Sequence, residues 1–384
     1  MTEKYKNMET KIIHAGDPKP PIKGAVCIPI FQSSTYEYKG EKTDSEVRYV
    51  RLSNTPNHKA LHRKLASLEN AESSLVTASG LAAISTTFLT LLSPGDHFLA
   101  LDCLYGGTKG FINHVLKKLH IHHDPIDGNN PDSWSSHLKP ETRAIYVETL
   151  TNPLLQVPDL GSIIQFARKN NLISIIDNTF ASPVNFRPPE MGFDISLHSC
   201  TKYLNGHSDI VGGAVIGKAD LIKQITNNLT HLGGSMDPNV CFLLYRGIKT
   251  LALRVRAQNA NTLKIAEFLE SHKKVNKVNY PGLKSHPHHD LAQELLDGFG
   301  GMISFELKGG TEEAERFTNK IKLAFIAPSL GGVETLVTRP VLTSHRELTK
   351  QEKIESGISD SLIRVSVGIE NVEDIISDFD QALS

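Results

Sequence analysis

The stretches Ile175-Ile176-Asp177-Asn178-Thr179 and Ser199-Cys200-Thr201-Lys202-Tyr203 decide the fold of this chain. The first stretch closes an apolar run, residues 172–176, which predicts a buried strand with Asp177 at its carboxyl end. In an α/β protein the carboxyl ends of the parallel strands meet at one edge of the sheet, where ligands bind. We therefore expect Asp177 to face a bound molecule.

The second stretch places a lysine directly after two short hydroxyl side chains, Ser199 and Thr201. Pyridoxal phosphate (PLP) needs a lysine for a Schiff base, a carboxylate for its ring nitrogen and small polar groups for its phosphate. An aspartate at a strand end is more often structural, and a Ser-x-Thr-Lys pattern is weak by itself. Together Asp177 and Lys202 favour a PLP site, provided that other motifs support it.

The composition is that of an ordinary globular enzyme. The 384 residues are 39% hydrophobic and 22% charged, which suffices for two or three domains with sizeable cores. With 41 basic and 42 acidic residues the formal charge is -1, so we expect no nucleic acid and no membrane as partners. The polar N-terminus and the lack of any apolar run near ~18 residues predict a cytoplasmic protein.

Several patterns typical of other functions are incomplete. Residues 212–218 resemble a phosphate-binding loop, but Ala219 replaces the hydroxyl residue that would hold Mg²⁺. No GxSxG or GxGxxG motif occurs, which disfavours hydrolases and dinucleotide-dependent dehydrogenases. The four scattered cysteines and the histidine clusters 120–123 and 286–289 lack zinc-site spacing. We therefore expect no metal, and we expect those histidines at the surface.

The order of the apolar segments predicts an α/β fold with a mostly parallel sheet. Residues 1–48 are rich in proline and polar side chains, so we expect an extended N-terminal arm rather than part of the core. A PLP-binding large domain is expected at 49–245 and a smaller α+β domain at 246–384. The predicted strands are 74–78 (or a turn), 98–101, 144–147, 172–176, 195–198, 211–216, 302–307 and 361–367, and the predicted helices are 58–68, 80–92, 108–119, 160–169, 239–270, 312–321 and 372–383.

Three further places carry groups that could bind a phosphorylated ring. Ser79 and Gly80 precede a helix whose first N–H groups could hold phosphate, although Ser79 could equally be an ordinary helix cap. Arg51 could contact phosphate or be a solvated charge. Tyr105 could stack on a planar ring or simply pack at a strand exit.

Taken together, the motifs of this chain resemble the PLP enzymes of cysteine and methionine metabolism, the cystathionine γ-lyase and γ-synthase group. The resemblance runs from Ile13 to the end of the chain. Its motifs are residues 13–16, 32–36, 77–83, 105–108, 148–153, 176–180, 201–209, 246–251, 280–283, 329–334 and 363–368. The resemblance implies an aspartate-aminotransferase-like, fold-type I enzyme that works as a homotetramer with active sites shared between subunits.

The resemblance also implies roles for individual residues. Lys202 is similar to the Schiff-base lysine, Asp177 to the partner of the ring nitrogen, and Tyr105 to the tyrosine that stacks on the ring. The residues expected to bind the cofactor phosphate are Ser79, Gly80, Leu81, Ser199 and Thr201, and Thr179 is expected to complete the cofactor site. Tyr49 and Arg51 match residues that reach the cofactor phosphate of a neighbouring subunit. Asn152, Ser329 and Arg364 match the residues around the substrate carboxylate.

The chain departs from the family pattern at several positions. Ser53-Asn54-Thr55-Pro56-Asn57 replaces the usual Gly-Asn-Pro-Thr, and Pro328 stands where many γ-acting members have a glutamate. Gly107 disfavours methionine γ-lyase, in which a cysteine is usual. The resemblance implies a carbon–sulfur lyase acting on cystathionine at Cβ or Cγ. A cystathionine γ-synthase, or a non-catalytic protein that binds PLP, stays an alternative.

Overall fold

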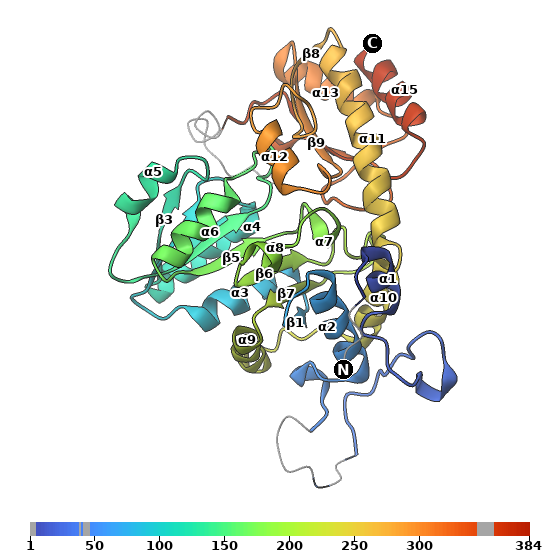
Figure 1. Cartoon of the computed structure of the whole chain (residues 1–384). Helices are drawn as coiled ribbons and strands as arrows, with labels where there is room; N and C mark the ends of the chain where they lie inside the picture. Colours follow the sequence, from blue (N-terminus) through green and yellow to red (C-terminus); the bar gives the residue numbers. More distant parts are fainter. Residues whose placement is uncertain (1–4, 38–39, 41–46, 344–356) are drawn as a thin grey trace.

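The computed structural model describes residues 5–37, 40, 47–343 and 357–384, and its main feature is a seven-stranded sheet (Figure 1). The strand order is β1-β7-β6-β5-β4-β2-β3. The strands are β1 Ser73–Thr77, β2 His97–Leu101, β3 His122–Ile126, β4 Thr142–Glu148, β5 Ile173–Asp177, β6 Ile195–Ser199 and β7 Gly213–Gly217.

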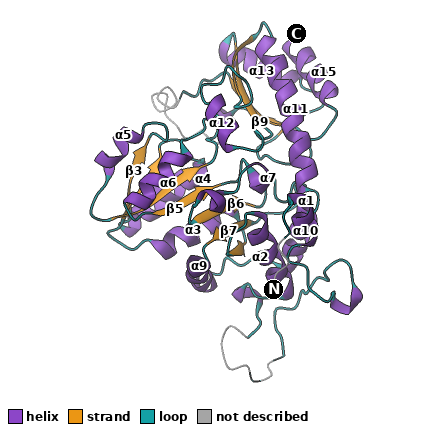
Figure 2. Ribbon diagram, viewed as in Figure 1, coloured by secondary structure: helices purple, strands orange, loops and turns teal. Residues whose placement is uncertain are grey.

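The direction of these strands confirms the predicted α/β class. Strands β3, β2, β4, β5 and β6 run parallel, whereas β7 is antiparallel to both β6 and β1. The central strands are continuous apolar runs because helices cover the sheet, as α3 does over β6 and β7 (Figure 2). The described helices are α1 Met8–His14, α2 Pro56–Leu68, α3 Gly80–Leu91, α4 Gly106–Phe111, α5 Pro131–Trp134, α6 Leu160–Lys169, α7 Ser182–Asn185, α8 Pro188–Met191, α9 Ala219–Leu232, α10 Pro238–Ile248, α11 Leu251–Ser271, α12 His289–Leu295, α13 Gly310–Lys320 and α15 Val372–Leu383.

Three neighbouring strands bring polar residues to the same edge of this sheet. Strand β4 ends at Glu148, β5 at Asp177 and β6 at Ser199. Glu148 and Asp177 are direct partners in the parallel register. The loops that follow these strands therefore leave the sheet next to one another.

A second sheet of five strands forms the C-terminal part of the chain. Its order is β10-β11-β12-β9-β8. The strands are β8 Val275–Asn279, β9 Met302–Leu307, β10 Phe325–Ile326, β11 Leu336–Thr338 and β12 Leu362–Ser366. The long helix α11 runs from the large sheet to this second sheet (Figure 1), and the predicted domain division near residue 245 falls within the preceding helix, α10.

The N-terminal segment departs in part from the expected arm. Helix α1 packs against α2, and its Ile12 is buried in the same apolar cluster as Leu61 and Leu65. The buried Lys64 of α2 donates hydrogen bonds to the carbonyl oxygens of Ile12 (2.9 Å) and Ile13 (3.2 Å). The expectation that none of residues 1–48 joins the core is thus wrong for 8–14, because a distant lysine, rather than local periodicity, holds this helix. Residues 38–39 and 41–46 of the expected arm lie outside the described part.

In the described part of the chain, no helix is both long enough and apolar enough to cross a bilayer.

Candidate active site

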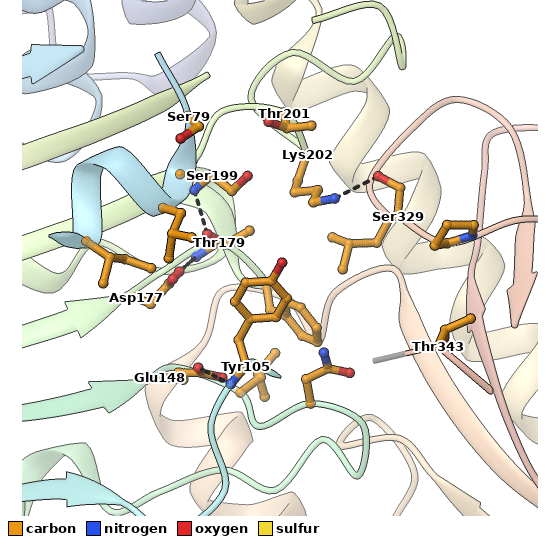
Figure 3. A pocket seen from close by; sticks show the side chains of 18 of the residues that line it. Ser79, Tyr105, Glu148, Asp177, Thr179, Ser199, Thr201, Lys202, Ser329 and Thr343 are labelled. Atoms are coloured by element: carbon orange, nitrogen blue, oxygen red, sulfur yellow. Dashed lines mark hydrogen bonds between the residues drawn. The ribbon is translucent and has the colours of Figure 1, made fainter. Parts of the chain in front are cut away.

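A cavity of about 620 Å³ lies at the carboxyl edge of the large sheet (Figure 3). Segments from both sheets contribute to its walls. It brings together most of the residues that the sequence pointed to: Ser79, Gly80, Leu81, Tyr105, Asn152, Asp177, Thr179, Ser199, Thr201, Lys202, Ser329 and Arg364.

Lys202 projects into this cavity from the turn that follows β6. Its Nζ atom donates a hydrogen bond to Ser329 Oγ at 2.8 Å. Burial lowers the pKa of Lys202 to about 8, and the nearby charge of Arg364 contributes to the shift. About a tenth of the amine is therefore neutral at pH 7, far more than for a lysine in water, and a neutral amine can attack a carbonyl carbon or accept a proton.

Asp177 ends β5, and a hydrogen-bond chain fixes its carboxylate. Its Oδ1 accepts the backbone N–H of Thr179 at 2.9 Å, and Thr179 Oγ1 accepts the N–H of Ser199 at 2.8 Å. Burial raises the pKa of Asp177, while the hydrogen bonds from Thr179 oppose that shift. A cationic ring nitrogen at this position would compensate the buried negative charge, so the site fits PLP.

Helix α3 begins at the cavity with its N–H groups exposed to a ligand. Ser79 Oγ accepts the N–H of Ala82 at 3.0 Å, so its hydroxyl is the cap of α3, one of the two roles expected for it. A Cβ atom on Gly80 would lie 2.8 Å from Ser199 Cβ, so glycine allows the helix to approach the end of β6. The first N–H groups of a helix have no partner within it, which makes Gly80 and Leu81 suitable for a phosphate.

Arg364 of β12 is the cation on the opposite wall of the cavity. Its side chain donates to Asn152 Oδ1 (3.1 Å) and to the carbonyl oxygen of Ser329 (3.2 Å), and its buried Nε has no partner. No ion pair involves Arg364 among the described residues, and burial lowers its pKa to about 10. A buried guanidinium with an unmatched N–H is well suited to a ligand carboxylate. Ser329 has a φ of 97°, an unfavourable conformation typical of functional sites.

Tyr49 and Arg51 lie outside this cavity. Arg51 Nη1 donates to the carbonyl oxygen of Thr230 at 2.8 Å, close to the end of α9, and the Tyr49 side chain is exposed. Neither residue lines the cavity of this chain. Ser53, which replaces the usual glycine, has a φ of 53°, so this loop adopts a left-handed conformation without glycine.

The sequence interpretation missed Glu148 as a site residue. Glu148 lines the cavity, and its Oε1 accepts the N–H of Tyr105 at 2.7 Å. Burial and the neighbouring Asp177 raise the pKa of Glu148 well above its usual range. The rule that selected Asp177, a carboxylate at the end of a buried strand, would also have selected Glu148.

The histidine cluster 286–289 has structural partners. His288 Nδ1 accepts the N–H of Val157, and His286 Nδ1 accepts the N–H of His288. His286 is buried, so its expected surface position is wrong; the ring terminates a turn instead. Among the described residues, no three His, Cys, Asp or Glu side chains are grouped so that they could hold a metal ion.

Comparison with known proteins gives the same picture over the whole chain. Residues 9–384 match the family described as Cys/Met metabolism PLP-dependent enzyme. The chain belongs to this family. It is therefore a PLP-dependent enzyme, and the cavity with Lys202, Asp177 and the start of α3 offers the groups that this cofactor needs.

Relatives within the family cover nearly the full length. The cystathionine beta-lyase of Lactococcus lactis subsp. cremoris (strain MG1363) is 43% identical over 98% of this chain and 99% of its own. The L-methionine gamma-lyase of Fusobacterium nucleatum subsp. polymorphum is 40% identical over 100% and 99%. The crystal structure of cystathionine gamma-lyase from Lactobacillus plantarum complexed with L-serine is 38% identical and covers 98% of both chains with a TM-score of 0.94. This similarity confirms the fold-type I architecture.

Proposed function

We propose that the chain is a carbon–sulfur lyase that cleaves cystathionine with PLP. With water consumed, the products are an amino-acid thiol, ammonia and a 2-oxo acid. The observation that carries the proposal is the convergence of Lys202, Asp177 and Arg364 on one cavity. Full-length relatives named cystathionine beta-lyase and cystathionine gamma-lyase support this substrate.

The geometry of the large sheet supports the proposed cofactor site. Lys202 would hold the cofactor covalently, Asp177 and Thr179 would face its ring nitrogen, and Tyr105 would stack on its ring. The phosphate would be bound mainly by the backbone N–H groups at the start of α3, with Ser79, Gly80, Leu81, Ser199 and Thr201 around it. When bound, PLP supplies an electron sink for the carbanion that remains after Cα loses its proton.

The other residues of the cavity bind and orient the amino acid. Arg364, supported by Asn152, donates its unmatched N–H group to the α-carboxylate. Lys202 moves the proton at Cα, and its lowered pKa keeps part of the amine free to accept that proton. Ser329 Oγ, 2.8 Å from Lys202 Nζ, limits the positions that this amine can take.

The walls at the cavity mouth bear on the choice of reaction. Pro328, Val211 and Leu342 line the outer part of the cavity, where many γ-acting members of the family have a glutamate in place of Pro328. A Cβ on Gly107 would lie 2.5 Å from Tyr105 Cε1, so the cysteine usual in methionine γ-lyases would displace this ring. The absence of that cysteine from this chain disfavours methionine as the preferred substrate. Cystathionine γ-synthase activity stays the second candidate, since it needs the same cofactor groups.

The proposal includes assembly as a cytoplasmic homotetramer. Tyr49 and Arg51 lie away from the cavity of their own chain, and the exposed Arg51 donates a hydrogen bond to the carbonyl oxygen of Thr230 and lies over the Tyr49 ring. This position supports a role at the cofactor phosphate of a neighbouring subunit.

Product analysis tests the proposed function. The purified enzyme is incubated with cystathionine, with cysteine, and with an activated homoserine ester plus cysteine, and the products are identified. Release of a 2-oxo acid from cystathionine is expected; the thiol identifies the cleaved bond, because homocysteine reports cleavage at Cβ and cysteine at Cγ. Formation of cystathionine from the ester would instead establish the synthase.

The variant Lys202→Ala is the control for this assay. It should lose turnover while remaining folded, since no other amine lines the described cavity. Turnover equal to that of the unchanged enzyme would contradict the proposed role of Lys202. A wild-type protein that binds PLP but converts none of these compounds would indicate the non-catalytic alternative.

A further inference from the structure

Glu148 is a buried acid in the cavity to which the proposed function gives no role. It ends β4, directly opposite Asp177 in the sheet register, and only 5% of its surface is exposed. A carboxyl group is rarely buried so fully without a specific partner. Figure 3 shows that its partner is the backbone of Tyr105.

The hydrogen bond from Tyr105 N to Glu148 Oε1, 2.7 Å long, holds the start of a short helix. Tyr105 is the N-cap position of α4, and no side chain of α4 itself caps that helix. The next two residues, Gly106 and Gly107, have the widest backbone freedom of any residue type. Glu148, at the end of β4, thus fixes the turn at residues 105–107, whose two glycines would otherwise leave it flexible.

The same turn determines where the Tyr105 ring lies. The ring rests on Gly107, with Tyr105 Cε1 only 2.5 Å from the position of a Cβ on that residue. Tyr105 is nevertheless 47% exposed as a residue, so few side chains surround its ring. Its place therefore depends on the backbone of residues 105–107, and Glu148 is the side chain that anchors this backbone to the sheet.

A neutral carboxyl group suffices for this contact. Burial and the adjacent Asp177 both raise the pKa of Glu148. A protonated carboxyl still accepts an N–H on its carbonyl oxygen, as the amide oxygen of glutamine does. Substitution of Glu148 with glutamine therefore shows whether its role requires a negative charge or only a hydrogen-bond acceptor.

We propose that Glu148 is a positioning residue, which holds the Tyr105 backbone so that the tyrosine ring covers the cofactor. This inference rests on the proposed function, since it assumes that Tyr105 stacks on PLP. Glu148 acts through Tyr105 and takes no part in the chemical step.

The test compares three variants of the holoenzyme: Glu148→Gln, Glu148→Asp and Glu148→Leu. The measurements are the PLP dissociation constant, the visible circular dichroism of the bound cofactor, and kcat and KM. We expect Glu148→Leu and Glu148→Asp to weaken PLP binding roughly tenfold, the equivalent of one hydrogen bond to a buried group, and to reduce the circular dichroism signal. Glu148→Gln should retain PLP within about twofold of the unchanged enzyme.

Glu72→Leu is a matched control. Glu72 Oε2 accepts the N–H of Ala219 at 2.8 Å, so it too holds the first residue of a helix, α9, from a distant segment. It lies outside the cavity. This variant should lower the unfolding temperature without changing PLP affinity.

A double-mutant cycle with Tyr105→Ala shows whether Glu148 acts through the tyrosine. Once the ring is absent, Glu148→Asp should cause no further loss of PLP affinity. Independent, multiplicative losses would overturn the proposal, as would a Glu148→Asp or Glu148→Leu enzyme with unchanged PLP affinity and circular dichroism. Failure of the proposed function would look different, because the unchanged enzyme would then produce no 2-oxo acid.

Discussion

At the scale of single residues, the chemistry of Lys202 depends on its surroundings. A lysine in water is almost fully protonated at neutral pH, but burial and the charge of Arg364 lower the pKa of Lys202 to about 8. We expect reductive methylation of Lys202 in the cofactor-free protein to speed up as pH rises through about 8. Mass spectrometry of the peptide that contains Lys202 measures this rate.

The variant Arg364→Met should move that midpoint to higher pH. Removal of the guanidinium takes away a positive charge that disfavours the ammonium form, while burial continues to lower the pKa. Lys218 is the internal control, since Asp194 raises its pKa through a hydrogen bond and charge. A midpoint for Lys202 that does not differ between the two proteins would show that Arg364 has no influence on this amine.

At the scale of elements, one face of α11 organises both loops of the active site. The buried Arg254 donates to the carbonyl oxygens of Tyr203 (2.8 Å) and Gly247 (2.9 Å), which holds the loop after Lys202. One turn further along the helix, Gln258 Nε2 donates to the carbonyl oxygen of Gly332 at 2.8 Å, in the loop that carries Ser329. Helix α11 therefore connects the two loops that bring Lys202 and Ser329 together.

Replacing Arg254 should loosen this connection. Arg254→Met leaves buried carbonyl groups without donors, so we expect a loss of about 2–3 kcal/mol in the free energy of unfolding, together with reduced kcat. Arg254→Lys should retain only part of the stability and of kcat, because an ammonium group lacks the planar fork of the guanidinium. Denaturant unfolding and steady-state kinetics are the measurements.

Arg256 of the same helix provides the comparison. Its side chain is 56% exposed and pairs with Glu9 at the surface, so Arg256→Met should cost less than about 1 kcal/mol. Equal effects of the Arg254 and Arg256 substitutions would contradict the special role of the buried residue.

The elements that could be predicted from sequence are those with a strong apolar pattern. Strands β2, β4, β5 and β9 were found because burial requires continuous apolar runs. Strand β3, with the sequence His122-His123-Asp124-Pro125-Ile126, was missed because an edge strand has one neighbour and tolerates both polar side chains and proline. Strand β8 was missed for the same reason, since it lies at the edge of the second sheet.

The active-site residues that could be predicted from sequence are likewise those with a strong local pattern. Asp177 and Lys202 could be selected from local sequence because each stands next to a recognisable strand or motif. Asn152, Ser329 and Arg364 came only from the family resemblance, since their meeting depends on the packing of the two sheets. Arg254 has no local signature at all, because the partner that ties it to the loop after Lys202 is the carbonyl oxygen of Tyr203, 51 residues away.

At the scale of the whole molecule, the cavity of one chain lacks two of the predicted cofactor residues. Arg51 lies on the surface, bound to the carbonyl oxygen of Thr230, and Tyr49 packs its ring 5.5 Å from the Arg51 guanidinium. An arginine that contacts a phosphate through a charge-assisted hydrogen bond contributes roughly 1.5–3 kcal/mol. If this contact is made in a neighbouring subunit, Arg51→Ala should weaken PLP retention by about one to two orders of magnitude and make activity depend on added cofactor.

Complementation between subunits distinguishes a shared site from a site within one chain. Arg51→Ala chains carry an intact Lys202, and Lys202→Ala chains carry an intact Arg51. When the two are unfolded, mixed and refolded, a hybrid assembly contains some cavities that combine Lys202 from one subunit with Arg51 from its neighbour. Such cavities should recover activity at low PLP concentration, where each parent alone is inactive or nearly so. Labelled chains and native mass spectrometry establish that hybrids form. If hybrids form but regain no activity, Arg51 either binds the cofactor of its own subunit or does not contact PLP.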